Sequence, residues 1–315
     1  MEKKIIAIIG ATGAQGGGLA RAIAADPNGG FAVRALTRKP DSDKARELAA
    51  KGAEVVAADL DDFESLRKGF TGAHGVFCVT NFWEHFSPEK EMAQAKTQAE
   101  ACKAAGVKHV IWSTLEDTRI RVPLSDARMP TLKEKYKVPH FDAKGESDNA
   151  FRAAGVPTTF LLTSFYWDNL IHFGMGPKPG PDGNLSFVLP MGDKKLPGIA
   201  ADDIGKCAYG IFKRGKEFIG KTVGIAGEHL TGAQMAEALS KSLGRPVSHG
   251  AVTPEVYRTF GFPGADDLGN MFQYKRDFER EFCGARDLSL ARALNPELQT
   301  FAQWLQANQA RIPTT

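Results

Sequence analysis

The sequence predicts an α/β protein with a doubly wound parallel sheet and a second, smaller α/β lobe. Two patterns predict this fold class. Short β-branched runs alternate with helical segments through the first half of the chain, and a glycine-rich turn joins the first run to the first helix. The length of 315 residues also corresponds to about two domains of roughly 150 residues each. Together these features are typical of a Rossmann-type fold.

The first half of the chain supplies the parallel sheet. Strands of such sheets are buried on both faces, so short continuous apolar runs are predicted to form them. The predicted strands are residues 4–9, 31–37, 54–57, 75–79, 108–113 and 158–163. The predicted helices between them are residues 15–25, 44–51, 63–70, 88–105 and 141–154.

The second half of the chain has a less regular pattern. Helices are predicted at residues 201–212, 231–243, 254–260 and 267–277, and strands at 222–225 and 247–252. Residues 174–184 are rich in glycine and proline, which indicates a surface excursion. We therefore expect a domain over residues 1–157, joined by about 198–227, and a C-terminal lobe over 158–197 and 228–315. A cleft is expected between the two.

Composition excludes several classes of protein. The net charge of +3 is too balanced for a nucleic-acid-binding protein, so no direct contact with nucleic acid is expected. No apolar run approaches the ~18 residues of a membrane span, and no secretory leader is predicted. The four cysteines form no CxxC pair and the histidines are dispersed, so no metal site is expected. A reducing, cytoplasmic location fits this cysteine usage.

The glycine-rich turn predicts a dinucleotide site. Residues 10–16 read GATGAQG, directly after a strand and at the start of a helix. In this setting the first glycine permits a tight turn, the second admits a pyrophosphate, and the third allows close packing of helix and strand. Free N–H groups at the helix start then bind the phosphates. The candidate residues are Gly10, Thr12, Gly13, Ala14, Gln15 and Gly16, in a domain that is expected to bind NAD(P).

The end of the second strand indicates which nucleotide is bound. An acidic residue there would bind the ribose 2′-hydroxyl of NAD, but the sequence reads Thr37-Arg38 with no carboxylate. Arginine suits a phosphate because its planar guanidinium donates several hydrogen bonds. NADP(H) is therefore the predicted cofactor. Asp59 and Leu60 are expected beside the adenine, although Asp59 could equally belong to a helix cap.

Several segments together resemble the NmrA-like family of atypical short-chain dehydrogenases/reductases. They are residues 10–17 (GATGAQGG), Thr37-Arg38, residues 79–84 (VTNFWE), 139–146 (PHFDAKGE) and 261–272 (GFPGADDLGNMF). The last two are most similar to a human redox-sensing member of the family. The resemblance covers essentially the whole chain. It implies a Rossmann domain with a smaller lobe, NADP(H) binding, little dehydrogenase activity and a regulatory protein partner, and it leaves a homodimer open.

The resemblance also places candidate residues around the nicotinamide. The Tyr-x-x-x-Lys pair of active short-chain dehydrogenases corresponds here to His140 and Lys144, and the family's serine to Ser113. Lys144 is expected to contact the cofactor ribose, with a catalytic role as the alternative. His140 could transfer protons, but a cap or a cofactor contact is the competing interpretation. Further cofactor neighbours are expected after the fourth and sixth strands, namely Thr80, Asn81, Phe82, Phe165, Tyr166 and Asn169.

Residues 116–139 are predicted to form a long loop next to these residues. Three prolines punctuate the segment, and long loops in compact domains are often functional. We expect few apolar anchors in it, mobility without nucleotide, and protection once NADPH binds. Within it, the charged run at residues 133–137 is expected to face solvent.

Two functions remain open at this stage. The first is an NADP(H)-responsive regulator, favoured by the histidine at the tyrosine position. The second is an NADPH-dependent reductase of a small quinone, carbonyl or enone that uses Lys144. A DNA-binding repressor is disfavoured by the charge balance.

Overall fold

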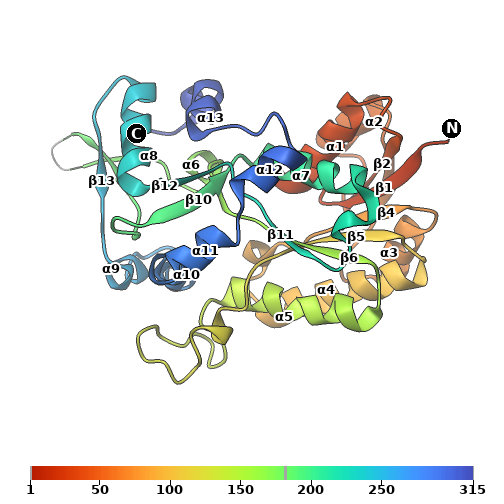
Figure 1. The fold of residues 1–315 in the computed structure, drawn as a ribbon, viewed down its shortest axis with the longest axis horizontal. Coiled ribbons are helices and arrows are strands. Elements are labelled where there is room, and N and C mark those ends of the chain that lie inside the picture. The colour runs from red at the N-terminus through yellow and green to blue at the C-terminus, as the bar shows by residue number, and fades with distance from the viewer. Residues whose placement is uncertain (1, 181–182, 315) are drawn as a thin grey trace.

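A seven-stranded sheet forms the centre of the protein in the computed structural model, which describes residues 2–180 and 183–314 (Figure 1). All of its neighbouring strands pair in parallel, in the order β11-β6-β5-β4-β1-β2-β3. The strands are β1 (Lys4–Ile9), β2 (Phe31–Thr37), β3 (Glu54–Ala57), β4 (Gly75–Cys78), β5 (His109–Thr114), β6 (Thr158–Leu162) and β11 (Thr222–Gly224). The predicted fold class is confirmed.

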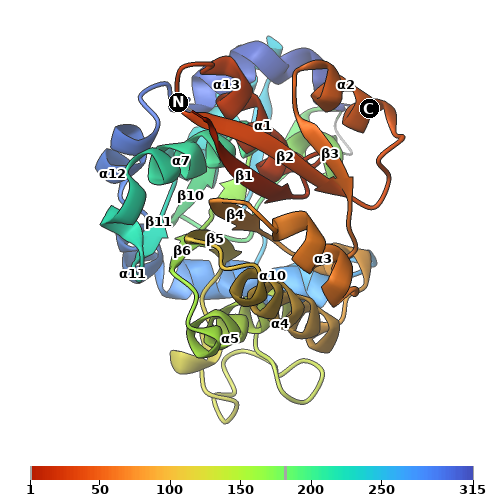
Figure 2. The same cartoon turned by 90° about the vertical axis from the view of Figure 1, so that its right-hand side faces the viewer.

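Helices cover both faces of this sheet (Figure 2). One face carries α1 (Ala14–Ala25), α2 (Asp43–Ala50), α7 (Ala201–Lys213) and α12 (Leu288–Leu294), and the other carries α3 (Phe63–Phe70), α4 (Pro88–Ala104) and α5 (Pro139–Ala154). Side chains of a strand alternate between faces, so Ile6 and Ile8 of β1 pack toward α1 while Ala7 and Ile9 pack toward α3 and α4. This burial on both faces explains the continuous apolar run of β1.

The second lobe contains two small sheets with strand orders β12-β10-β7 and β13-β9-β8. Its strands are β7 (Phe165–Tyr166), β8 (Lys178–Pro179), β9 (Leu185–Val188), β10 (Lys195–Ile199), β12 (Glu228–Thr231) and β13 (Val247–Gly250). Its helices are α6 (Asn169–His172), α8 (Gly232–Leu243), α9 (Pro254–Arg258), α10 (Ala265–Asp277), α11 (Glu279–Gly284) and α13 (Phe301–Asn308). Trp167, Phe187 and Phe272 lie in its core.

The segment between β5 and α5 differs from the prediction. It contains one short 3-10 helix, Thr118–Ile120, and is otherwise a loop. The expectation of few apolar anchors is wrong, because Val122, Met129 and Val138 are buried in the core of the second lobe. The expectation that residues 133–137 face solvent is also wrong for Tyr136 and Lys137, which are 2% and 1% exposed.

Polar contacts explain how this loop is held. The buried carboxylate of Asp142, in the first turn of α5, accepts hydrogen bonds from the backbone of Thr118, Lys137 and Val138. The ammonium of Lys137 donates to the carbonyl oxygens of residues 126 and 129. A sequence pattern of prolines and mixed charges does not reveal that a single carboxylate satisfies several backbone groups.

Helices α1 and α7 pack unusually closely on one face of the sheet. A Cβ atom at Gly205 of α7 would lie 2.0 Å from the backbone nitrogen of Leu19, and one at Gly18 of α1 would lie 2.5 Å from the carbonyl oxygen of Asp202. Real Cβ atoms do not approach backbone atoms so closely, so both positions require glycine. The ion pair between Arg21 and Asp202 lies at the same contact.

Replacing Gly205 with Ala should therefore destabilise the protein. Overpacking typically costs about 1–3 kcal/mol, and here the clash is with backbone that cannot rotate away. Gly284→Ala is the matched control, because Gly284 is exposed in α11 with nothing near its Cβ position. It should be neutral or stabilising by up to about 1 kcal/mol. Urea unfolding of both variants measures this, and an equal midpoint for the two would contradict the packing described.

Candidate functional site

A cleft of about 1220 Å³ runs along the carboxyl edge of the central sheet and into the second lobe. The carboxyl ends of parallel strands all meet at this edge, where open α/β sheets bind ligands. Every candidate residue predicted from the sequence lines it, which places widely separated segments together. They are Gly10, Thr12, Gly13, Ala14, Gln15, Gly16, Thr37, Arg38, Asp59, Leu60, Thr80, Asn81, Phe82, Ser113, His140, Lys144, Phe165, Tyr166 and Asn169.

The glycine turn brings the start of α1 to the cleft. Gly10 adopts φ +65°, a conformation that favours glycine, and a Cβ atom at Gly16 would lie 2.5 Å from the carbonyl oxygen of Gly10. Gly13 precedes α1 with φ −97°, and no side chain caps the helix. The first N–H groups of α1 are thus left for a ligand. Such a helix start binds anions such as phosphate.

Arg38 already has a partner at the far end of the cleft. Its guanidinium forms two hydrogen bonds with the carboxylate of Glu84, at N···O distances of 2.5 and 3.0 Å. Both side chains remain partly exposed, and the guanidinium lowers the pKa of Glu84. An incoming phosphate would compete with Glu84 for Arg38. No sequence pattern indicated a role for Glu84, because its proximity to Arg38 depends on the path of the β4–α4 connection.

Asp59 was expected either beside the adenine or in a helix cap, and the structure separates these two roles. The cap of α3 is Asp62, whose carboxylate accepts hydrogen bonds from the backbone N–H groups of Glu64 and Ser65. Asp59 lines the cleft instead, and its carboxylate accepts a hydrogen bond from the N–H of Asp61. Asp59 therefore lies beside the cleft, and Asp62, not Asp59, is the N-cap of α3.

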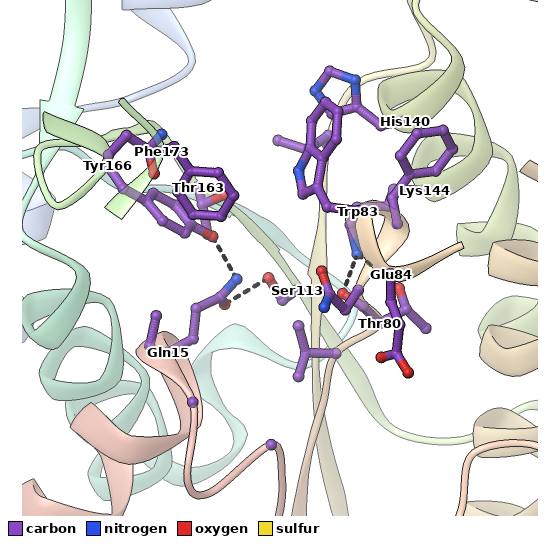
Figure 3. Close-up of a pocket in the computed structure, with 18 of the residues that line it drawn as sticks. Gln15, Thr80, Trp83, Glu84, Ser113, His140, Lys144, Thr163, Tyr166 and Phe173 are labelled. Atoms are coloured by element: carbon purple, nitrogen blue, oxygen red, sulfur yellow. Dashed lines mark hydrogen bonds between the residues drawn. The ribbon is translucent and has the colours of Figure 1, made fainter. Parts of the chain in front are cut away.

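Gln15 connects three parts of the cleft (Figure 3). Its amide nitrogen donates to the hydroxyl of Tyr166 at 2.5 Å, and its amide oxygen accepts from the hydroxyl of Ser113 at 2.8 Å. Burial raises the pKa of Tyr166 to about 12, so its phenol stays protonated at neutral pH. This chain of hydrogen bonds ties the start of α1 to the end of β5 and to β7.

Lys144 is held by a carboxylate, that of Glu91, for which the sequence indicated no role. Its ammonium lies 2.9 Å from Oε1 of Glu91 and donates to the hydroxyl of Thr80 at 2.7 Å. It also lies 5.1 Å from the ring centre of Trp112. Glu91 comes from α4 and is fully buried, while Nε2 of His85 approaches its second oxygen at 3.5 Å. In the sequence, Glu91 carried no signal beyond its charge, because nothing local indicates that this position of α4 is buried.

His140 forms a contact between the two lobes. Its Nδ1 lies 2.6 Å from the carboxylate of Asp267 in α10, and both side chains are buried. The ring also packs beside Trp83 and Phe82, at centroid distances of 4.8 and 5.8 Å. One ring nitrogen of His140 is therefore already engaged by a carboxylate. Asp267 lay within a segment used only for the family resemblance, and nothing in the sequence paired it with residue 140.

The site presents an uncapped helix start, which suits an anion, and it has an apolar end in the second lobe. Among the described residues, no group of three or more His, Cys, Asp or Glu side chains is arranged to hold a metal ion. In the same part of the chain, no helix is long and apolar enough to cross a membrane.

Known proteins are similar to this chain over most of its length. The model of the NmrA-like family matches residues 2–305. The NmrA-like family domain-containing oxidoreductase FrzB of Cladobotryum sp is 29% identical over 284 residues, covering 86% of this chain and 83% of FrzB. The NAD(P)H azoreductase of Xenophilus azovorans is 29% identical over 253 residues, covering 80% of this chain and 78% of the enzyme.

A solved structure is similar as well. The crystal structure of NmrA, a negative transcriptional regulator, in complex with NADP has a TM-score of 0.78 at 26% identity, covering 97% of this chain and 95% of NmrA. Its complex with NAD gives a TM-score of 0.79 at the same identity and coverage.

The Lys144–Glu91 pair leads to a prediction about stability. Lys144→Met should lower the free energy of unfolding by about 3 kcal/mol, because it leaves the Glu91 carboxylate buried without its cation. The double variant Lys144→Met, Glu91→Gln should recover most of this loss, since the amide carries no charge.

The matched control breaks an exposed ion pair. Lys96 and Glu100 of α4 lie 3.9 Å apart with side chains 69% and 54% exposed, so Lys96→Met should cost less than about 1 kcal/mol. Urea denaturation measures all three variants. A loss for Lys144→Met no larger than that for Lys96→Met would show that the buried pair contributes nothing special.

Proposed function

The chain belongs to the NmrA-like family, and from this premise we propose that it binds NADP(H) in the cleft and acts as a redox-sensing regulator with little or no dehydrogenase activity. The uncapped start of α1 is the observation that carries the binding proposal, since it leaves N–H groups where a pyrophosphate would lie. NmrA, which shares this fold, was crystallised with NADP and with NAD.

NADP(H) is preferred to NAD(H) in this proposal because of the charges around Arg38. The end of β2 carries no carboxylate, and Lys39 and Lys44 also line the cleft, whereas the charges of Asp59 and Asp61 act on Arg38 as well as that of Glu84. A ribose 2′-phosphate would draw Arg38 from Glu84 and keep it charge-paired. The carboxylate of Glu84 opposes the phosphate, so the preference is the balance of these interactions.

The regulatory part of the proposal rests on the ion pairs that the two candidate catalytic side chains, His140 and Lys144, already form. His140 replaces the tyrosine of active short-chain dehydrogenases and is paired with Asp267, while Lys144 is paired with Glu91. Because the His140–Asp267 contact joins two lobes, a cofactor that binds two lobe arrangements unequally would shift the balance between them. We also propose that the chain is closely related to a human redox-sensing member of the family, which residues 139–146 and 261–272 resemble.

An NADPH-dependent reductase is the second candidate. The observation in its favour is that the cleft continues past the dinucleotide residues into an apolar region lined by Phe173, Tyr257 and Phe272. FrzB is named an oxidoreductase, and the Xenophilus relative is an NAD(P)H azoreductase. A small quinone, carbonyl or enone would fit such a region, with Lys144 as the proton-transferring group.

We also propose the remaining features that were expected from the sequence. They are a domain of residues 1–157 joined by about 198–227, a lobe of 158–197 and 228–315, a regulatory protein partner, a homodimer, and a cytoplasmic location. Within this division, β6 and α12 belong with the first domain, because β6 is a strand of the central sheet and α12 packs on its face.

Isothermal titration calorimetry tests the nucleotide preference. NADP⁺ should bind at least tenfold more tightly than NAD⁺, a difference of about 1.4 kcal/mol, and Arg38→Ala should remove most of it. Glu84→Gln should strengthen NADP⁺ binding, because the guanidinium no longer has a competing carboxylate. The control Arg46→Ala removes an exposed arginine paired with Asp43 and should change neither affinity. Equal affinities in the unmutated protein would contradict the preference.

Turnover assays separate the two functional candidates. With NADP⁺ and simple alcohols, we expect a rate far below the ~1–10³ per second of typical enzymes. Sustained NADPH oxidation with a panel of quinones and enones would instead support the reductase. The double variant Lys144→Met, Glu91→Gln should then abolish turnover while remaining folded. If that variant retains full turnover, Lys144 is not the acid/base of the reaction.

A further inference from the structure

Helix α10 places one lysine, Lys275, in the apolar part of the cleft. Leu268, Met271, Phe272 and Lys275 follow one another at helical spacing and all line the cleft. Residues spaced by three and four positions share one face of a helix. Three members of this face are apolar, so Lys275 interrupts a stripe whose other positions suit a hydrophobic core.

Among the described residues, the ammonium of Lys275 has no anionic partner. Its residue is 3% exposed, and its nitrogen lies 3.2 Å from the sulfur of Met271. The nitrogen also lies 5.3, 5.6 and 5.4 Å from the ring centres of Phe141, Phe272 and Phe282. Within residues 2–180 and 183–314, no carboxylate forms an ion pair with it.

Two charged groups lie near Lys275, and they are already paired with each other. Glu116 and the fully buried Arg286 form two hydrogen bonds at 2.6 and 3.1 Å. Burial, together with the positive charge of Arg286, lowers the pKa of Lys275 to about 7, although the carboxylate of Glu116 opposes the shift. The carboxylate of Glu116 is therefore not available to neutralise Lys275.

Other buried cations in the chain contrast with Lys275. Lys144 is paired with Glu91, Arg286 with Glu116, and Lys137 donates to two backbone carbonyl oxygens. A buried ammonium without such partners is costly, and a methionine or leucine would fill the same position at no such cost. Folding does not explain the choice of lysine at this point, whereas a ligand that completes the charge pair would.

We propose that Lys275 forms the centre of a second ligand site on the second-lobe side of the cleft, which takes a flat aromatic molecule carrying one anionic oxygen group, a carboxylate or a phenolate. The rings of Phe141, Phe272 and Phe282 provide apolar walls for its body, and the ammonium binds its charge. The weak solvation of this pocket strengthens such an ion pair. The site goes beyond the dinucleotide proposal and does not depend on it.

Paired ligands test the site in the full-length protein by isothermal titration calorimetry, with and without saturating NADP⁺. The anionic probes are benzoate, 2-naphthoate and 4-nitrophenolate, and their uncharged counterparts are benzamide, 2-naphthamide and nitrobenzene. At least one anion should bind tenfold or more tightly than its counterpart. Lys275→Met should abolish this difference and raise the melting temperature, because it removes an unpaired buried charge.

Lys178→Met is the matched control, since Lys178 also lines the cleft but is exposed in β8. It should leave the preference for the anion intact. If no anion binds more tightly than its counterpart, or if Lys275→Met retains the preference, the proposed site is wrong. If the unmutated protein binds an anion more tightly than its uncharged counterpart but does not bind NADP⁺, only the dinucleotide proposal is contradicted.

Discussion

The close approach of α1 to the carboxyl end of β1 is the constraint on which the rest of the structure depends. It requires glycine at positions 10 and 16, because the turn has a positive φ at the first and no room for a Cβ atom at the second. Gly205 then lets α7 pack directly against α1. The outcome is a helix whose first N–H groups have no side-chain cap and open onto a cleft. An anion is the natural occupant of such a position.

Charge pairs join the two sides of this cleft. His140 of α5 binds Asp267 of α10, and Glu116, just after β5, binds Arg286 near the C-terminus. Their partners are far apart in sequence and lie in buried surroundings, where removing one member of a pair is costly. Any change in the spacing of the lobes must break or rearrange these contacts. One of these pairs involves His140, a candidate for proton transfer, and the other candidate, Lys144, is paired with Glu91.

Sequence patterns predicted the parallel sheet and the residues around its edge because strand periodicity and glycine turns are local signals. Strands β7, β8, β9, β10 and β12 were not predicted. Each is only two to five residues long, and β7, β10 and β12 find their partners about 30 residues away along the chain. The same limit applies to side-chain partners. Glu91, Glu84 and Asp267 carried no signal that would pair them with Lys144, Arg38 and His140. Likewise, proline content suggested a loosely held loop, whereas Asp142 and buried apolar side chains anchor it.

The central claim is that a nicotinamide dinucleotide lies along the edge of the sheet with its pyrophosphate at the start of α1. A crystal structure of the full-length protein grown with NADP⁺ tests it most directly. We expect pyrophosphate oxygens within hydrogen-bonding distance of backbone N–H groups between Gly13 and Gly16, and a 2′-phosphate beside Arg38. A nucleotide bound elsewhere, or one whose pyrophosphate makes no contact with this helix start, would contradict it.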